Sequence, residues 1–87
     1  NGGSMSFKIY KKDIYDAWLQ LVVNLVGENI LKEKSNYNKI NGISISPKKT
    51  FSIMKIWFSD NTINESKYLN NMDKFKYDES IYKEHSK

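Results

Sequence analysis

The most hydrophobic part of the chain is the segment 16–28, DAWLQLVVNLVGE, in which apolar residues recur at helical spacing. It carries two apolar stripes, whereas a helix at the surface of a small domain needs one. The first stripe consists of Trp18, Leu21, Val22 and Leu25, and the second of Leu19, Val23 and Val26. Asp13 is a suitable N-cap and Gly27 a suitable left-handed C-cap, so a helix is predicted over about 14–26.

Alternating apolar and polar residues predict strands on both sides of this helix. Residues 6–12 (SFKIYKK) suit a half-buried strand, and residues 40–46 (INGISIS) and 51–59 (FSIMKIWFS) form a predicted hairpin around the connector 47–50. In the second hairpin strand, one face carries Phe51, Ile53, Lys55 and Trp57, and the other carries Met54, Ile56 and Phe58. Because both faces are apolar, both are expected to be covered.

The remaining segments are more polar. Residues 28–39 are interpreted as a surface loop, a short helix is expected around 64–71, and one more strand is expected in the charged segment 74–87. The order of elements predicts an α+β fold in which the hairpin and the first strand share one antiparallel sheet and the helix lies across it.

Composition adds limits on size, redox chemistry and location. At 87 residues, with 39% hydrophobic and 14% aromatic residues, the chain is one domain or part of one, with a modest core. A formal charge of +4 permits an anionic partner without establishing one. The sequence has no cysteine, which excludes disulfides and thiolate metal sites. No apolar run reaches the roughly 18 residues of a membrane span and no leader is recognisable, so no membrane association and a cytoplasmic location are expected.

Catalytic chemistry has little support in the sequence. His85 is the single histidine and lies in a charged segment, so a solvated side chain is expected there instead of a general base or metal ligand. There is no Gly-rich phosphate-binding motif, and the acidic residues lie mainly in polar segments without a recognisable pair for acid–base work. The chain is therefore predicted to be a binding protein, not an enzyme, with no metal and no cofactor.

Residues 17–28, AWLQLVVNLVGE, resemble the helix written FWLETLLCLIGE in the translation initiation factor 4E family, the messenger-RNA cap-binding proteins. Trp18, Leu19, Gly27 and Glu28 match in register. The resemblance continues in order through the Gly–Gly pair at 2–3, the strand 41–46, the basic connector at 48–49 and the Lys-Ile-Trp at 55–57. It implies a curved antiparallel sheet backed by helices, and it implies that residues 1–87 are the C-terminal half of a single 4E-like domain.

The resemblance also implies where a cap would bind. In the family, 7-methylguanosine is held between two stacked tryptophans beside a glutamate that reads the guanine edge, and these three residues precede the Gly–Gly turn. Trp18 and Trp57 are therefore not expected to be the stacking pair. Trp57 aligns with a tryptophan that contacts the methyl group, and Lys48 with a phosphate-binding arginine. A second phosphate-binding lysine of the family falls on Ile53.

Lys55, on the same strand face as Trp57, and Lys49, in the connector, are candidates to replace that lysine. Other interpretations are that Trp57 is a core residue and that the lysines only solubilise the hairpin.

The second stripe of the helix matches the dorsal surface where the family binds an amphipathic helical segment of the initiation factor 4G scaffold or of 4E-binding proteins. The contact residues implied here are Trp18, Leu19, Gln20, Val23 and Gly27. Gln20 stands where the family often has a carboxylate, so one polar contact is expected to involve an amide instead. The alternative is that Leu19 and Val23 are covered by the missing N-terminal half or by the C-terminal segment.

The sequence thus predicts a translation initiation factor that binds capped messenger RNA and contributes the methyl and phosphate side of the cap site. The alternative is an interaction-only short form that binds the scaffold without holding a cap. A third interpretation is a general binder of single-stranded nucleic acid that uses lysines and aromatic residues.

Overall fold

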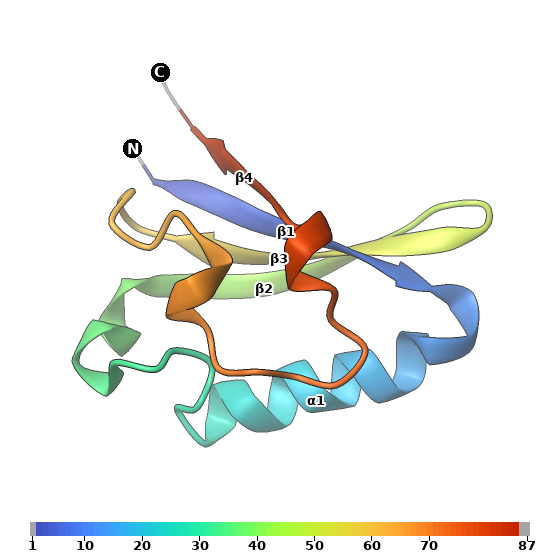
Figure 1. The fold of residues 1–87 in the computed structure, drawn as a ribbon, viewed down its shortest axis with the longest axis horizontal. Coiled ribbons are helices and arrows are strands. Elements are labelled where there is room, and N and C mark those ends of the chain that lie inside the picture. Colours follow the sequence, from blue (N-terminus) through green and yellow to red (C-terminus); the bar gives the residue numbers. More distant parts are fainter. Residues whose placement is uncertain (1, 86–87) are drawn as a thin grey trace.

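The computed structural model describes residues 2–85 and has an α+β architecture: a curved antiparallel sheet with one long helix (Figure 1). The strands are β1 (Gly3–Tyr10), β2 (Ile40–Pro47), β3 (Phe51–Phe58) and β4 (Ile81–Glu84), and the helix is α1 (Ile14–Val26). Four short 3-10 helices occur at Lys11–Asp13, Lys34–Lys39, Ser66–Tyr68 and Tyr77–Glu79. The predicted fold class, helix and hairpin are confirmed.

The sheet has the strand order β2-β3-β1-β4, so the first strand in sequence lies inside the sheet. β1 pairs with β3 along its whole length, from Gly3 opposite Phe58 to Tyr10 opposite Phe51. β4 pairs only with the first half of β1, from Gly3 opposite Glu84 to Ser6 opposite Ile81. In consequence the two ends of the described chain lie side by side (Figure 1).

The bounds of helix α1 are those predicted, but its two caps differ from the prediction. Asp13 occupies the N-cap position but makes no capping hydrogen bond; its carboxylate lies 3.6 Å from the Lys74 ammonium. At the other end the left-handed residue is Glu28, with φ 58°, and not Gly27, with φ −81°. The Glu28 N–H donates to the Leu25 carbonyl and the Asn29 N–H to the Asn24 carbonyl, which is a Schellman ending placed one residue later than predicted.

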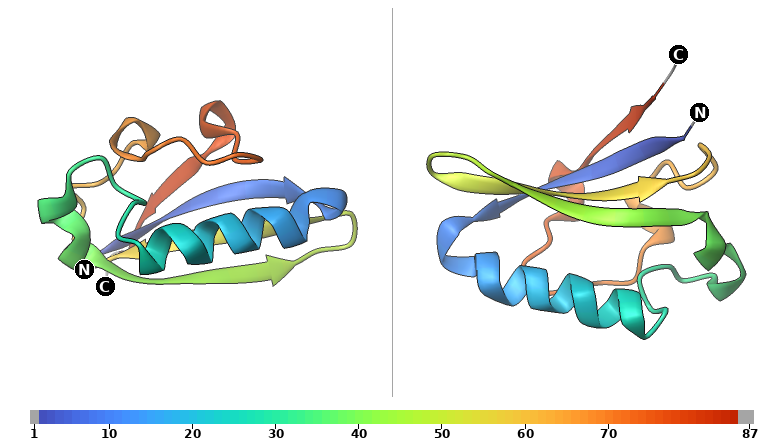
Figure 2. Two further views of the ribbon diagram at one scale, coloured as in Figure 1. Left: turned by 90° about the horizontal axis from the view of Figure 1, so that it is seen from below. Right: turned by 180° about the vertical axis from the view of Figure 1, so that it is seen from behind.

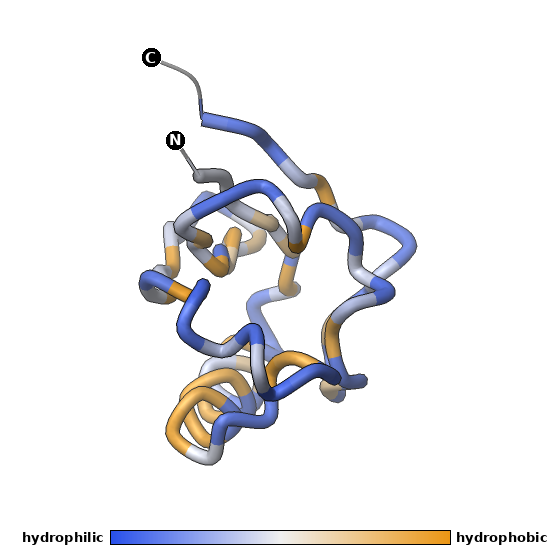
Figure 3. Tube along the Cα trace, turned by 90° about the vertical axis from the view of Figure 1, so that its left-hand side faces the viewer, coloured by the Kyte–Doolittle hydropathy of each residue, from blue (hydrophilic) through white to orange (hydrophobic). Residues whose placement is uncertain are grey.

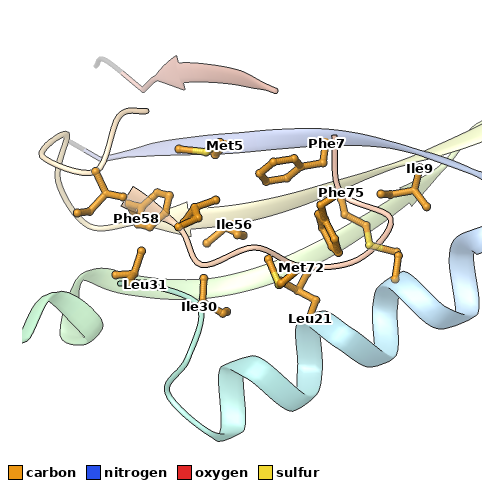
Figure 4. Close-up of a cluster of buried hydrophobic side chains, with 14 residues drawn as sticks. Met5, Phe7, Ile9, Leu21, Ile30, Leu31, Ile56, Phe58, Met72 and Phe75 are labelled. Carbon is orange, nitrogen blue, oxygen red and sulfur yellow. The ribbon is translucent and has the colours of Figure 1, made fainter. Parts of the chain in front are cut away.

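The core lies between one face of the sheet and a layer made of α1, the start of the segment that follows it and the segment 61–76, which all lie along the same face (Figures 2 and 4). The strands contribute Met5, Phe7, Ile9, Met54, Ile56 and Phe58; the covering layer contributes Ala17, Leu21, Ile30, Leu31, Ile63, Leu69, Met72 and Phe75. Phe7 and Phe75 meet edge to face, with ring centroids 5.2 Å apart. This geometry is favourable for two aromatic rings and ties the late segment to the central strand.

Three expectations are corrected, two about the polar segments and one about the faces of the sheet. Residues 28–39 are not simply a surface loop, because Ile30 and Leu31 are buried and Leu31 bridges to Leu69. The short helix expected around 64–71 is only the 3-10 turn Ser66–Tyr68. The sheet is covered on one face only: none of the elements within residues 2–85 lies over the other face (Figures 1 and 2).

Candidate functional site

The uncovered face of the sheet, called here the open face, carries the residues that alternate with the core residues along each strand. They are Ser4, Ser6, Lys8 and Tyr10 on β1; Phe51, Ile53, Lys55 and Trp57 on β3; Gly42, Ser44 and Ser46 on β2; and Ile81 and Lys83 on β4. Lysine is the only charged residue type at these positions. The open face therefore combines aromatic rings, hydroxyl groups and positive charge.

Trp57 is half-buried on the open face, and its ring is held from several sides. Its indole N–H donates to the Ser44 hydroxyl at 2.9 Å, and its ring meets the edge of the His85 imidazole at a centroid distance of 5.0 Å. The Lys55 ammonium lies 5.3 Å from the Trp57 ring centroid. Gly42, the β2 partner of Trp57, leaves open space, because a Cβ added there would meet no atom within 4 Å. The ring is thus oriented by neighbours while one side stays unobstructed.

His85 is not the solvated residue that the sequence suggested. Its backbone N–H donates to the Gly2 carbonyl at 2.8 Å, and its Nε2 shares a hydrogen bond of 3.2 Å with the buried Ser4 hydroxyl. These contacts continue the β1–β4 pairing by one residue and place the imidazole against Trp57. The alternation Ile81, Lys83, His85 along a strand is the sequence signal that could have placed His85 on this face.

The structure brings only part of the predicted basic set to Trp57. Lys55 is adjacent to its ring, whereas Lys48 and Lys49 are exposed in the connector at the other end of the hairpin. The Lys48 N–H closes that connector by donating to the Phe51 carbonyl at 2.8 Å. Phe51 and Trp57 are six residues apart on one strand, which corresponds to roughly 20 Å at about 3.3 Å per residue. Lys48 and Lys49 are therefore remote from Trp57.

A second candidate site lies on the far side of the core, along α1, which is the most continuously hydrophobic stretch of the chain trace (Figure 3). Leu19 and Val23 are 48% and 58% exposed, whereas Leu21 is fully buried. A groove of about 370 Å³ follows these two residues. Its lining comprises Asp16, Leu19, Gln20, Val23 and Asn24 from α1 and Asp73 and Lys74 from the covering segment.

Not every residue predicted for the helix surface lines this groove. Trp18 is half-buried and packs against the core, and Gly27 is exposed beyond the last turn of α1. Because Trp18 lies on the helix side of the sheet and Trp57 on the open face, the two rings cannot sandwich one base. This agrees with the expectation that they are not a stacking pair.

The amino-acid sequence is similar to that of a known protein family. A family model described as Eukaryotic initiation factor 4E matches residues 1–86. The chain belongs to the eukaryotic initiation factor 4E family. Members of this 4E family are cap-binding translation initiation factors that act by binding and not by catalysis, and their partners in general are the messenger-RNA cap and 4G scaffolds or 4E-binding proteins. No curated protein and no solved structure matches the chain.

Within residues 2–85, no group of three or more histidine, cysteine, aspartate or glutamate residues is arranged to hold a metal ion. Among the same residues, no helix has the length and apolar character needed to cross a membrane.

Proposed function

We propose that this chain binds the 7-methylguanosine cap of messenger RNA on the open face of its sheet, where it contributes the methyl and phosphate side of the cap site. The observation that carries the proposal is the fixed ring of Trp57, held by Ser44 and His85 beside the open space at Gly42. A methylated guanine is positively charged, and a cation at an aromatic face gains about 0.5–2 kcal/mol depending on desolvation. The ring is therefore suited to favour a methylated over an unmethylated base.

Lys55 is the best placed phosphate ligand of this site. Its ammonium lies over Trp57, so a small movement would carry it to a phosphate while the cationic base takes its place at the ring. A lysine offers a point charge without the two-pronged geometry of arginine, so the phosphate contact should be less directional. Lys48 and Lys49, at the far end of the hairpin, would meet only more distant phosphates.

We further propose that residues 1–87 correspond to the C-terminal half of one 4E-like domain, with the stacking pair and the guanine-reading glutamate supplied by its N-terminal half. In support, the open face has one tryptophan within residues 2–85, while Trp18 faces the core from the other side. Two tryptophans that sandwich one base therefore have to come from outside the described residues.

The groove along α1 is proposed to bind an amphipathic helix of a 4G-like scaffold or of a 4E-binding protein. Leu19 and Val23 are one helical turn apart and both remain about half exposed, so one partner helix could bury them together. Gln20 lines the same groove and offers an amide to the partner. Trp18 would contribute indirectly, because it holds α1 against the core. Gly27 would contribute indirectly as well, because it ends the helix.

Titration of the full encoded protein with 7-methyl-GTP and with GTP tests the cap proposal. Trp57→Ala should weaken binding of 7-methyl-GTP more than binding of GTP, because the proposed contact is to the methylated base. Trp57→Phe, which keeps an aromatic ring but loses the hydrogen bond to Ser44, should retain part of the preference. Equal losses for the two nucleotides in Trp57→Ala would reduce Trp57 to a packing residue.

A second candidate function is an interaction-only protein that binds the scaffold and holds no cap. It is favoured by one observation: the α1 groove presents two half-exposed apolar side chains, Leu19 and Val23, whereas the described part of the open face offers a single tryptophan. A protein that binds a scaffold peptide and shows no preference for 7-methyl-GTP over GTP would support this second function.

A further inference from the structure

The open face has a second group of aromatic and basic side chains, at the end remote from Trp57. Tyr10 and Phe51 are cross-strand partners there, and Lys8 lies on the same face two residues before Tyr10. Lys76, from the covering segment on the other side of the sheet, reaches the Tyr10 ring beyond the point where β4 stops pairing with β1. These four residues, Lys8, Tyr10, Phe51 and Lys76, are called the strip below.

The ammonium groups of the strip lie over its rings. The Lys8 ammonium is 4.8 Å from the Phe51 ring centroid and 5.8 Å from that of Tyr10, and the Lys76 ammonium is 4.6 Å from that of Tyr10. Tyr10 is nevertheless 44% exposed, and both lysines are exposed. Cation–aromatic contacts at exposed sites are weak, so the lysines can leave the rings when a stronger partner arrives.

No carboxylate of the described chain forms an ion pair with a lysine of the strip. The ion pairs within residues 2–85 join Lys39 to Asp60, Lys67 to Glu65, and Lys74 to Asp13, and none of them includes a lysine of the strip. Four more exposed lysines flank the strip: Lys11, Lys12, Lys48 and Lys49. The strip therefore fits a partner that is polyanionic and also presents flat, apolar faces.

We propose that the strip binds a single-stranded segment of RNA, with bases stacked on Tyr10 and Phe51 and with Lys8 and Lys76 turned to the phosphates. Single-stranded nucleic acid offers both groups, because its bases are free to stack on aromatic rings while its backbone follows basic side chains. A duplex would offer the phosphates without accessible base faces. The inference rests on the proposed function in that the partner is RNA, but it does not need the cap contact at Trp57.

The position of the strip is consistent with one RNA chain that spans the open face. Trp57 and Phe51 lie on the same side of β3, roughly 20 Å apart at about 3.3 Å per residue. Lys55 lies between them on the same side of the strand. An RNA whose first nucleotide contacts Trp57 could thus extend along the face to the strip, and the lysine between them would lie along its backbone.

Binding of a fluorescently labelled, uncapped oligouridine to the full chain tests the role of the rings. Tyr10→Ala and Phe51→Ala should each weaken binding about tenfold, the size expected when a base loses its aromatic platform. The matched control is Tyr15→Ala, which removes a tyrosine that is 76% exposed on α1, away from the open face. The control should change affinity less than twofold, and a loss equal to that of Tyr10→Ala would overturn the proposal.

The lysines are tested in separate variants, so the proposal can still be tested if Phe51→Ala impairs folding. In Lys8→Gln with Lys76→Gln, the slope of log affinity against log salt should become shallower by about 1.4, since each lost phosphate contact on a single strand accounts for about 0.7. The control pair Lys32→Gln with Lys34→Gln removes two exposed lysines from the segment after α1. An equal change of slope in both pairs would show non-specific attraction and refute the strip.

Competition experiments distinguish single-stranded RNA from other polyanions, and they distinguish the strip proposal from the cap proposal. Tighter binding of oligouridine than of an RNA duplex of equal length supports the strip, whereas equal binding of the duplex, or equally strong displacement by polyglutamate, overturns it. A protein that binds oligouridine through the strip but does not prefer 7-methyl-GTP would refute the cap proposal alone. A protein that prefers 7-methyl-GTP but binds oligouridine equally with and without the strip residues would refute the strip alone.

Discussion

The double substitution Leu19→Ala with Val23→Ala should separate partner binding from folding. The two changes remove about five carbon groups, which are worth about 4 kcal/mol when fully buried, at about 0.8 kcal/mol each. Because Leu19 and Val23 are 48% and 58% exposed in the free chain, about half of this burial free energy is gained only when a partner covers them. A helix that covers both residues should therefore lose about 2 kcal/mol of binding, or roughly 30-fold in Kd.

The other half of this burial free energy already stabilises the folded chain. The contacts that Leu19 and Val23 already make should cost the double variant up to about 2 kcal/mol of stability, reduced by about 0.5 kcal/mol because alanine favours helix over valine. Leu21→Ala is the matched control: Leu21 is fully buried on the same helix, so its truncation should cost about 2–5 kcal/mol of stability. Among molecules that remain folded, Leu21→Ala should bind the partner normally.

Calorimetric titration with a scaffold-derived helical peptide, alongside thermal unfolding of each variant, measures both effects. Cap affinity of the full protein serves as an internal reference and should stay nearly unchanged in the double variant. The reasoning fails if the double variant binds the peptide within threefold of the parent. It fails also if its unfolding resembles that of Leu21→Ala without a separate binding defect, because the second stripe would then be core.

Three further predictions concern single side chains. Lys48→Ala should weaken binding of a capped oligonucleotide, whose later phosphates can reach the far end of the hairpin, by a factor that shrinks with added salt, because contacts of an exposed charge are screened; titrations at several salt concentrations measure it. His85→Ala should increase the mobility of the Trp57 ring, seen as lower fluorescence anisotropy in a Trp18→Phe background, and His85→Phe, which restores an aromatic edge, should recover it. Burial raises the pKa of Tyr77 above its ordinary value of 10.0, so the unfolded chain loses this proton first. Stability should therefore fall as pH rises above about 10, by up to about 1.4 kcal/mol per pH unit until the folded pKa is passed, and chemical unfolding of Tyr77→Phe should show a shallower fall.

Each of these predictions has an opposite outcome. A salt-independent effect of Lys48→Ala would count against a phosphate contact. Unchanged Trp57 anisotropy in His85→Ala would show that Ser44 alone fixes the ring. If Tyr77→Phe lost stability above pH 10 as steeply as the parent, the other tyrosines with raised pKa values, Tyr37 and Tyr82, would account for the whole dependence.

The elements that sequence reasoning placed correctly are those encoded by local periodicity. The spacing of Ala17 and Leu21 in α1 and the alternation from Phe51 to Phe58 each fit within one element, so neighbouring residues suffice to identify them. The helix end was harder, because Gly27 and Glu28 are both compatible with the stop and only the Schellman hydrogen bonds decide between them.

Features that depend on distant partners could not be predicted in the same way. Ile30 and Leu31 lie among polar residues, and only their contacts with the late segment, such as the bridge from Leu31 to Leu69, explain their burial. The environment of His85 depends on pairing with a strand about 80 residues away, which no local window contains. The proposed site is therefore divided: Trp57 and Lys55 could be found from one strand, whereas Ser4 and His85 required the folded sheet.

The central position of β1 has a kinetic consequence. Its pairing with β4 joins residues separated by almost the whole described chain, from Gly3 with Glu84 to Ser6 with Ile81. Contacts between residues so far apart in sequence form late in folding, because closing the long loop between them costs conformational entropy. The same short pairing has few neighbours to hold it, so it should be among the first parts of the sheet to open in the native state. Amide hydrogens between β1 and β4 should thus exchange before those between β1 and β3, and each opening would also release the histidine that braces Trp57.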